Sequence, residues 1–409
     1  MYNLDYIKLN KKYDQKNYIH AEFYMESTLS DKQAAAALAT ESSIGTWTKV
    51  STMEKKKFKK LAARVYEISK KYSRIKVAYP LDLFEKGNIP QLLSSVAGNI
   101  YSLKEITSLR LINLHFPPAY IKSFPGPAFG QKGIRKVTQV KNRPLIGVII
   151  KPKLGLSPAR HAQVAYQVLK NGADLVKDDE NLTNQKFNPF KKRVKKTLEK
   201  VKKIEKTSET KKLVAFNVTA STPEMIERAK FVKKHGGRCI MIDLVTAGFS
   251  GLQALREANL GLIIHGHRAM HSAFTRGSQH GLDYYVLAKL ARLAGIDELH
   301  SGTIVGKMAG NKEEVLKVNK FLNGQLYGLK KTMPVSSGGL HPGLVEKLIK
   351  LLGQNIIINF GGGVHGHPDG SAEGMKAAWS AVKAVSSGLT LKKAAKKSPS
   401  LKKAIEFFK

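Results

Sequence analysis

The stretch LIGVIIKPKLGLSPARHAQVAYQVLKNGADLVKDDE, residues 145–180, decides the fold class. It holds two short apolar runs, Leu145–Lys151 and Ala173–Asp179, which predict two β-strands. The segment between the runs starts with a Ser-Pro pair, ends with an Asn-Gly pair and repeats small or apolar residues at helical spacing. These features predict a helix that packs on a sheet. The whole stretch therefore predicts a strand, helix, strand unit of a parallel sheet.

The same alternation continues toward the C-terminus and predicts eight strands in all. We therefore expect an α/β fold in which residues 126–409 form a (β/α)8 TIM barrel, with lysine-rich surface helices over 389–409. The six further strands are predicted at Leu213–Ala220, Cys239–Val245, Gly261–Arg268, Glu298–Thr303, Met333–Gly339 and Ile356–Gly363.

Residues 1–125 have a different pattern, which predicts a smaller N-terminal α+β domain. A strand is expected at 18–26, a helix at 31–40 and a lysine-rich helix near 54–72. The Gly- and Pro-rich stretch 123–136 is typical of a connection between domains.

The composition is strongly basic, because 69 Lys and Arg stand against 31 Asp and Glu and give a net charge of +38. The lysines are spread over many predicted helices, and arginines do not alternate with aromatic residues, so a solvated surface is favoured over a nucleic-acid groove. A basic nucleic-acid-associated protein without catalysis is the remote alternative. The sequence contains no long apolar run, which predicts a cytoplasmic protein with no membrane partner. The single Cys239 lies in an apolar run and is expected to be buried.

Chemistry in a (β/α)8 barrel lies at the C-terminal ends of the strands, and six of the eight predicted ends carry polar residues or glycines. Asp179 and Glu180 offer hard oxygen ligands that suit Mg²⁺. Gly361 and Gly362 follow strand eight, where backbone N–H groups commonly hold a phosphate. A second phosphate is expected at Arg268, His300 and Ser337. The sequence therefore predicts a site for a metal and two anionic ends.

At these residues the sequence resembles the large chain of ribulose-1,5-bisphosphate carboxylase/oxygenase (RuBisCO), over nearly its whole length. HGHRAMH together with MPVSSGGLHPG resembles the archaeal-type form III branch. The motifs that carry the resemblance, in the family's order, are ESSIGTWT (41–48), GVIIKPKLGLS (147–157), GADLVKDDENLTNQ (172–185), HGHRAMHSAFTR (265–276), HSGTIVGKMAG (300–310), MPVSSGGLHPG (333–343) and INFGGGVHGHP (358–368).

The resemblance implies a lyase that adds CO2 to ribulose 1,5-bisphosphate and yields two 3-phosphoglycerates, with O2 as the competing gas. It implies that Lys177 takes up CO2 as a carbamate, which completes a Mg²⁺ site with Asp179 and Glu180. The other catalytic residues implied are Lys151 as a proton donor, His267 in proton transfer, and Lys307 on the loop after strand six.

The resemblance also implies which residues bind the substrate and which come from a partner subunit. Glu41, Thr46, Trp47 and Asn99 match residues on the partner side of the site, so a homodimer with shared sites is expected. Higher homo-oligomers are compatible with this, and no small subunit is expected. Form III resemblance further implies a role in AMP and ribose salvage. The implied substrate-binding residues are Lys153, Arg268, His271, His300, Ser337, Gly339, Gly361 and Gly362.

The nearest alternative is a rubisco-like enolase or isomerase that acts on another phosphorylated sugar. Such proteins usually replace several catalytic positions, whereas this chain keeps all the residues named above for the metal and for proton transfer. Ile149, Met308 and Asn359 depart from the plant-type sequence, and archaeal-type members also depart around these places.

Overall fold

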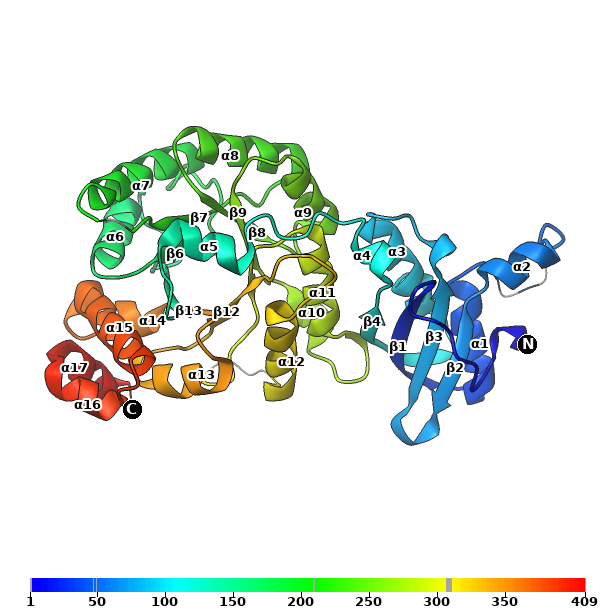
Figure 1. Ribbon diagram of the computed structural model, residues 1–409. Helices are drawn as coiled ribbons and strands as arrows, with labels where there is room; N and C mark the ends of the chain where they lie inside the picture. The colour runs from blue at the N-terminus through cyan, green and yellow to red at the C-terminus, as the bar shows by residue number, and fades with distance from the viewer. Residues whose placement is uncertain (1, 47, 49, 209, 307–310, 409) are drawn as a thin grey trace. The chain divides into compact units, whose positions relative to one another are not determined.

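The computed structural model describes every residue except 1, 47, 49, 209, 307–310 and 409. The chain forms two compact units, of which the first comprises Met1–Phe124 and Met270–Leu293 and the second Pro125–Ala269 and Ala294–Lys409 (Figure 1). This division differs from the expected one at residue 125 and over the segment 270–293. That segment groups with the first unit because it contributes a strand to the first unit's sheet.

The second unit is a closed barrel of eight parallel strands in the order β11-β12-β13-β5-β6-β7-β8-β9. The predicted α/β barrel is therefore confirmed, and each predicted run contains one of its strands. The strands are shorter than the runs because the polar residues at their ends leave the ladder. They are β5 Leu145–Ile149, β6 Leu175–Lys177, β7 Leu213–Asn217, β8 Cys239–Asp243, β9 Ile263–His267, β11 Glu298–His300, β12 Met333–Ser337 and β13 Ile357–Phe360.

Helices alternate with these strands along the chain (Figure 1). The predicted helix start at residues 157–158 is confirmed, since the Ser157 side chain accepts a hydrogen bond from the Arg160 N–H at the start of α6. The helices of this unit are α5 Gly130–Thr138, α6 Pro158–Lys170, α7 Phe190–Glu205, α8 Thr222–Lys234, α9 Gly248–Glu257, α12 Lys312–Asn323, η5 Pro342–Leu344, α13 Val345–Leu352, α14 Gly362–His365, α15 Gly370–Ser386, α16 Leu391–Lys397 and α17 Pro399–Phe407.

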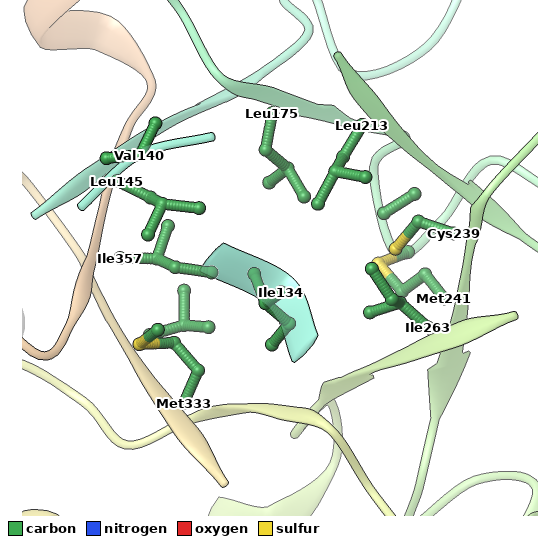
Figure 2. Close-up of a cluster of buried hydrophobic side chains, with 12 residues drawn as sticks. Ile134, Val140, Leu145, Leu175, Leu213, Cys239, Met241, Ile263, Met333 and Ile357 are labelled. Carbon is green, nitrogen blue, oxygen red and sulfur yellow. The ribbon is translucent and has the colours of Figure 1, made fainter. Parts of the chain in front are cut away.

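The barrel interior is filled by apolar side chains that face inward from the strands. Ile134, on α5, lies in the middle of this ring of side chains (Figure 2). The stretch 123–136, expected as a connection, thus contributes a helix to the core. Cys239 is fully buried here, as predicted. The cluster consists of Ile134, Val140, Leu145, Leu175, Leu213, Ala215, Cys239, Met241, Ile263, Met333, Val335 and Ile357.

The first unit contains a five-stranded sheet in the order β10-β4-β1-β3-β2, antiparallel except for the β10 and β4 pair. Its elements are η1 Leu4–Tyr6, β1 Tyr18–Ser27, α1 Asp31–Glu41, α2 Lys55–Leu61, β2 Arg64–Ser69, η2 Lys70–Tyr72, β3 Arg74–Pro80, η3 Leu81–Leu83, α3 Ile89–Val96, η4 Asn99–Ser102, β4 Ile106–His115, α4 Pro118–Ile121, α10 His271–Thr275, β10 Gly281–Leu282 and α11 Tyr284–Ala294.

The long helix expected near 54–72 is wrong in its second half. α2 ends at Leu61, and Arg64–Ser69 form β2. The segment RVYEIS contains the strand-favouring residues Val65, Tyr66 and Ile68, and Val65 is fully buried where β2 pairs with β3. Pairing with β3 therefore outweighs the helical tendency of the lysines that precede it.

No helix within the described residues is both long enough and apolar enough to cross a lipid bilayer.

One buried carboxylate connects the barrel strands to α5. Asp297, which precedes β11 and is fully buried, accepts hydrogen bonds at Oδ1 from the N–H groups of Phe129 and Gly130, at 2.7 and 2.9 Å. Its Oδ2 accepts from the Ile264 N–H at 3.0 Å and from Arg256 Nη2 at 2.6 Å. The carboxylate therefore caps the start of α5 and neutralises a buried guanidinium.

We predict that Asp297→Asn lowers the unfolding free energy of this unit by at least about 3 kcal/mol. The amide nitrogen would face two donors, and the charge of Arg256 would stay buried without a counterion. The midpoint of urea unfolding measures the effect. Asp369→Asn is the matched control within the same unit, because Asp369 is 47% exposed and its ion pair with Lys403 lies at the surface, where the change should be within about 0.5 kcal/mol. Equal midpoints for the two variants would show that the carboxylate does not hold α5.

Candidate active site

Three consecutive side chains at the end of β6, those of Lys177, Asp178 and Asp179, point in alternating directions. Asp178 points to the helices, where its Oδ2 accepts from Arg193 Nε on α7 at 3.0 Å and its Oδ1 lies 3.1 Å from His161 Nε2 on α6. Burial alone would raise the pKa of Asp178, but the charge of Arg193, the contact with His161 and the Asn217 N–H together outweigh burial and hold the pKa at about 2. Lys177 and Asp179 point the other way, as a strand requires.

Four charged side chains meet beyond the strand ends. Lys151 Nζ, after β5, donates to Asp179 Oδ2 at 2.9 Å, and Lys177 Nζ donates to Glu180 Oε2 at 3.4 Å. His267 Nε2 lies 3.6 Å from Glu180 Oε2. The structure thus brings together the predicted metal ligands and two of the predicted catalytic residues.

Burial and neighbouring charges shift the pKa values of two residues in this cluster, Lys177 and Glu180. Lys177 is 1% exposed, and burial lowers the pKa of its ammonium although neighbouring carboxylates oppose the shift. Burial alone would raise the pKa of Glu180, but the nearby charges of Lys177 and His267 outweigh it and hold the pKa at about 2. The cluster therefore combines an ionised carboxylate with an amine that loses its proton more readily than an exposed lysine.

A chain of hydrogen bonds runs from β11 through β9 to β12. His265 Nδ1 lies 2.7 Å from Glu298 Oε2, and His265 Nε2 lies 2.9 Å from His300 Nε2. His300 Nδ1 lies 2.8 Å from Ser337 Oγ. Burial lowers the pKa of both histidines well below the usual range, so both are neutral near pH 7.

The other groups predicted to bind the substrate in the second unit follow the ends of β5, β9, β12 and β13. Arg268 packs against Gly302, where an added Cβ would come within 2.9 Å of Nη2. Next to Gly362 at the start of α14, an added Cβ would meet no described atom within 4 Å, so an anion has room to approach the backbone. Gly361 precedes it, and Gly339 and Lys153 are exposed.

Some predicted residues lie in the first unit. Asn99 Nδ2 donates to Glu41 Oε1 at 3.4 Å, so these two are brought together. Thr46 lines a hollow of about 790 Å³ that also borders Tyr6, and the described residues that line it belong to the first unit. His271 belongs to this unit as well, with its Nδ1 2.9 Å from Thr275 Oγ1. Trp47 and Lys307 lie outside the described residues.

Two strand ends that sequence reasoning left out also carry polar groups. Asp243, at the end of β8, accepts from His267 Nδ1 at 3.1 Å. Asn217, at the end of β7, donates through Nδ2 to the carbonyl oxygens of Asp179 and Glu180 at 3.3 and 3.0 Å. A polar residue that closes an otherwise apolar run was the signal for both.

In the part of the chain that the structure describes, no three His, Cys, Asp or Glu side chains are grouped to hold a metal ion. Asp179 and Glu180 supply two carboxylates beside Lys177, and hard oxygen ligands of this kind suit Mg²⁺. The residues fit a divalent ion if a third anionic ligand is added at this place.

Comparison with known proteins agrees with this geometry. Residues 131–408 match the family model for the ribulose bisphosphate carboxylase large chain, catalytic domain, and residues 5–120 match the model for its N-terminal domain. A ribulose bisphosphate carboxylase from Methanocaldococcus jannaschii is 44% identical over 427 residues, which cover 99% of this chain and 100% of that protein.

Solved structures extend the similarity to three dimensions. The octameric ribulose-1,5-bisphosphate carboxylase/oxygenase from Pyrococcus horikoshii OT3, crystallised with sulfate, has a TM-score of 0.96 and 44% identity, covering 99% of this chain and 96% of that one. The dimeric archaeal Rubisco from Hyperthermus butylicus has a TM-score of 0.92 and 39% identity, with 98% of each chain covered. On the family models, the sequence identity and the shared fold together, this chain belongs to the ribulose bisphosphate carboxylase large-chain family.

Proposed function

We propose that this chain adds CO2 to ribulose 1,5-bisphosphate and forms two molecules of 3-phosphoglycerate. The observation that carries the proposal is a buried lysine, Lys177, that contacts Glu180 and lies two residues before Asp179, while Lys151 and His267 each contact one of these carboxylates. The curated relative and the solved structures named above are carboxylases of this type.

Lys177 is proposed to be the residue that takes up CO2. Its neutral amine nitrogen attacks the carbon of CO2, one proton leaves the nitrogen, and a carbamate anion remains on the side chain. Only the neutral amine can react, and the burial that lowers the pKa of Lys177 increases the neutral fraction. An exposed lysine lacks this advantage.

Asp179, Glu180 and the carbamate of Lys177 are proposed to hold Mg²⁺. The carbamate would provide the anionic oxygen that the two carboxylates need to complete a site of hard ligands. When bound, the ion would stabilise negative charge that develops on the sugar oxygens. Asn217, which holds the backbone carbonyls of residues 179 and 180, keeps both ligands in position.

The remaining polar groups are proposed to handle protons and phosphates. The Lys177 carbamate removes a proton from the sugar, Lys151 returns one, and His267, whose ring is oriented by Asp243, takes part in transfer at the neighbouring hydroxyl. Lys307 is proposed to neutralise the incoming carboxylate.

Two groups of residues are proposed to bind the two phosphates. The guanidinium and hydroxyl donors present at one end suit an anion, and the open space beside the backbone of Gly362 supports the assignment of the other. One end comprises Arg268, His271, His300 and Ser337, and the other comprises Thr46, Trp47, Gly339, Gly361 and Gly362. Lys153 is proposed to bind the substrate beside Lys151.

We further propose a homodimer, or a multiple of it, whose active sites are shared between subunits. Glu41 and Asn99 contact each other in the first unit, and the strand-end cluster lies wholly in the second. The dimeric and octameric archaeal relatives support such an assembly. A role in nucleotide salvage remains a proposal based on the form III resemblance.

The rival functions make different predictions in one assay. Protein incubated with ribulose bisphosphate, Mg²⁺ and labelled bicarbonate should form labelled phosphoglycerate. A rubisco-like isomerase would convert its sugar without taking up label, and a nucleic-acid-binding protein would do neither. Folded protein that yields no labelled product would overturn the proposed function.

We predict that Lys177→Met reduces carboxylation by at least roughly 10²- to 10⁴-fold, because the side chain can no longer take up CO2. Labelled phosphoglycerate measures this loss. Carbon NMR with labelled CO2 gives a second readout, since a carbamate signal should be present in the parent and absent in the variant. The control is Lys170→Met at the exposed end of α6, which should keep both activity and signal. Equal activity of parent and Lys177→Met would reject the carbamate.

We predict that two inactive variants restore activity when their subunits are mixed. Glu41→Gln and Lys177→Met each damage every site of their own homodimer. In a hybrid dimer one of the two sites combines an unaltered Glu41 with an unaltered Lys177. Random exchange of subunits should therefore recover about a quarter of the parent activity. If each site lay within one chain, mixing would recover none.

A further inference from the structure

The hydrogen-bond chain Glu298–His265–His300–Ser337 contains two residues, Glu298 and His265, to which nothing above assigns a role. Glu298 and His265 are fully buried, His300 is 3% exposed, and Ser337 is half-buried at the site end. Three contacts of 2.7, 2.9 and 2.8 Å join the four side chains without a gap. A change in the protonation of Glu298 can therefore alter the hydrogen bond that Ser337 makes.

The direction of all three hydrogen bonds depends on whether Glu298 carries a proton. If Glu298 is ionised, His265 Nδ1–H donates to it, His300 Nε2–H donates to His265, and the Ser337 hydroxyl must donate inward to His300 Nδ1. Ser337 then presents only lone pairs outward, which repel an anion. If Glu298 is protonated, each bond reverses, His300 Nδ1–H donates to Ser337, and the hydroxyl hydrogen is directed outward.

A second observation favours the protonated acid. Glu298 Oε1 is buried and has no hydrogen-bond partner among the described residues. A carboxylate would leave half of its negative charge on this unpaired atom, whereas the carbonyl oxygen of a neutral acid costs far less to bury. Burial, together with the adjacent Asp297 carboxylate, raises the pKa of Glu298 to about 8.

The charged and titratable groups around the chain are consistent with this assignment. The Asp297 carboxylate, directly before Glu298 in the sequence, is paired with Arg256, and the Cys239 thiol on β8 is protonated, since burial raises its pKa. The other groups whose charges act on the two histidines are Lys177 on β6, His267 on β9 and Arg268 after it.

We propose that Glu298 is a positioning residue: its proton sets the direction of the hydrogen bonds through His265 and His300, so that Ser337 donates its hydroxyl to a phosphate-type dianion. The identity of that anion rests on the proposed function. Below the pH at which Glu298 ionises, the hydroxyl points outward and the anion binds tightly. Above that pH, the hydroxyl turns inward and binding weakens.

The variant Glu298→Gln distinguishes the proposed effect of the Glu298 proton from an effect of side-chain packing. The glutamine has the same shape, and its amide N–H can donate to His265 Nδ1 at every pH, as the protonated acid does. The probe is inorganic sulfate, a dianion whose charge does not change in this range, with its dissociation constant measured by calorimetry at about pH 7 and about pH 9.5.

The parent should lose about tenfold more affinity over this interval than Glu298→Gln, because one hydrogen bond to a charged group is lost only in the parent. Other titrating groups, such as surface lysines, are common to both proteins and cancel in the comparison. Ser337→Ala should behave like Glu298→Gln, since it lacks the hydroxyl that turns. The same pH dependence in all three proteins would overturn the proposal.

The proton itself gives an independent readout. The infrared spectrum near pH 7 should contain a protonated-carboxyl band that disappears in Glu298→Gln, and the lack of such a band would also overturn the proposal. Neither measurement uses ribulose bisphosphate or CO2. A protein that binds sulfate as described but fixes no CO2 would refute the proposed function and leave this inference intact.

Discussion

The arrangement of the site depends on one buried ion pair behind the sheet. Asp178 and Arg193 are both fully shielded from solvent, and Asp178 Oδ2 also accepts from the Asn217 N–H at 3.0 Å. Because side chains alternate along a strand, holding Asp178 on the helix side forces Lys177 and Asp179 to the other side. Loss of the guanidinium would leave a buried carboxylate without a counterion, so the strand end has little freedom to turn. The helix α7 thereby sets the geometry of groups it does not touch.

Uptake of CO2 and binding of a metal are linked through charge. In the structure two ammonium groups, Lys151 and Lys177, balance the carboxylates of Asp179 and Glu180. Conversion of Lys177 to a carbamate would replace one of those cations by an anion, at a position that is 1% exposed. Such an excess of buried negative charge is unfavourable unless a cation enters.

Much of the fold could be predicted from the sequence, because apolar runs and helix-capping residues are local features, and each predicted run does form a strand in the structure. The eight strand predictions succeeded for this reason. The lysine-rich segment before β2 was misassigned because the strand is stabilised by its pairing with β3, which local propensity does not contain. Asp179, Glu180 and His267 could be named as candidates from their positions at strand ends. Glu298 could not, because its role depends on a contact with His265, 33 residues away in the sequence.

The parallel register explains how such distant residues form one chain of hydrogen bonds. Glu298 on β11 pairs with His265 on β9, so the two side chains leave neighbouring strands at the same level of the barrel. His300 follows two residues after Glu298 on the same strand, and its side chain therefore points to the same side, one level closer to the strand end. Ser337 on β12 lies beyond it. The three hydrogen bonds thus connect the buried Glu298 to Ser337 at the strand ends, and each of them joins two adjacent strands. In each hydrogen bond a donor is paired with an acceptor. Polar side chains can therefore lie this deep in the barrel, and Oε1 is the one oxygen of Glu298 that stays unpaired among the described residues.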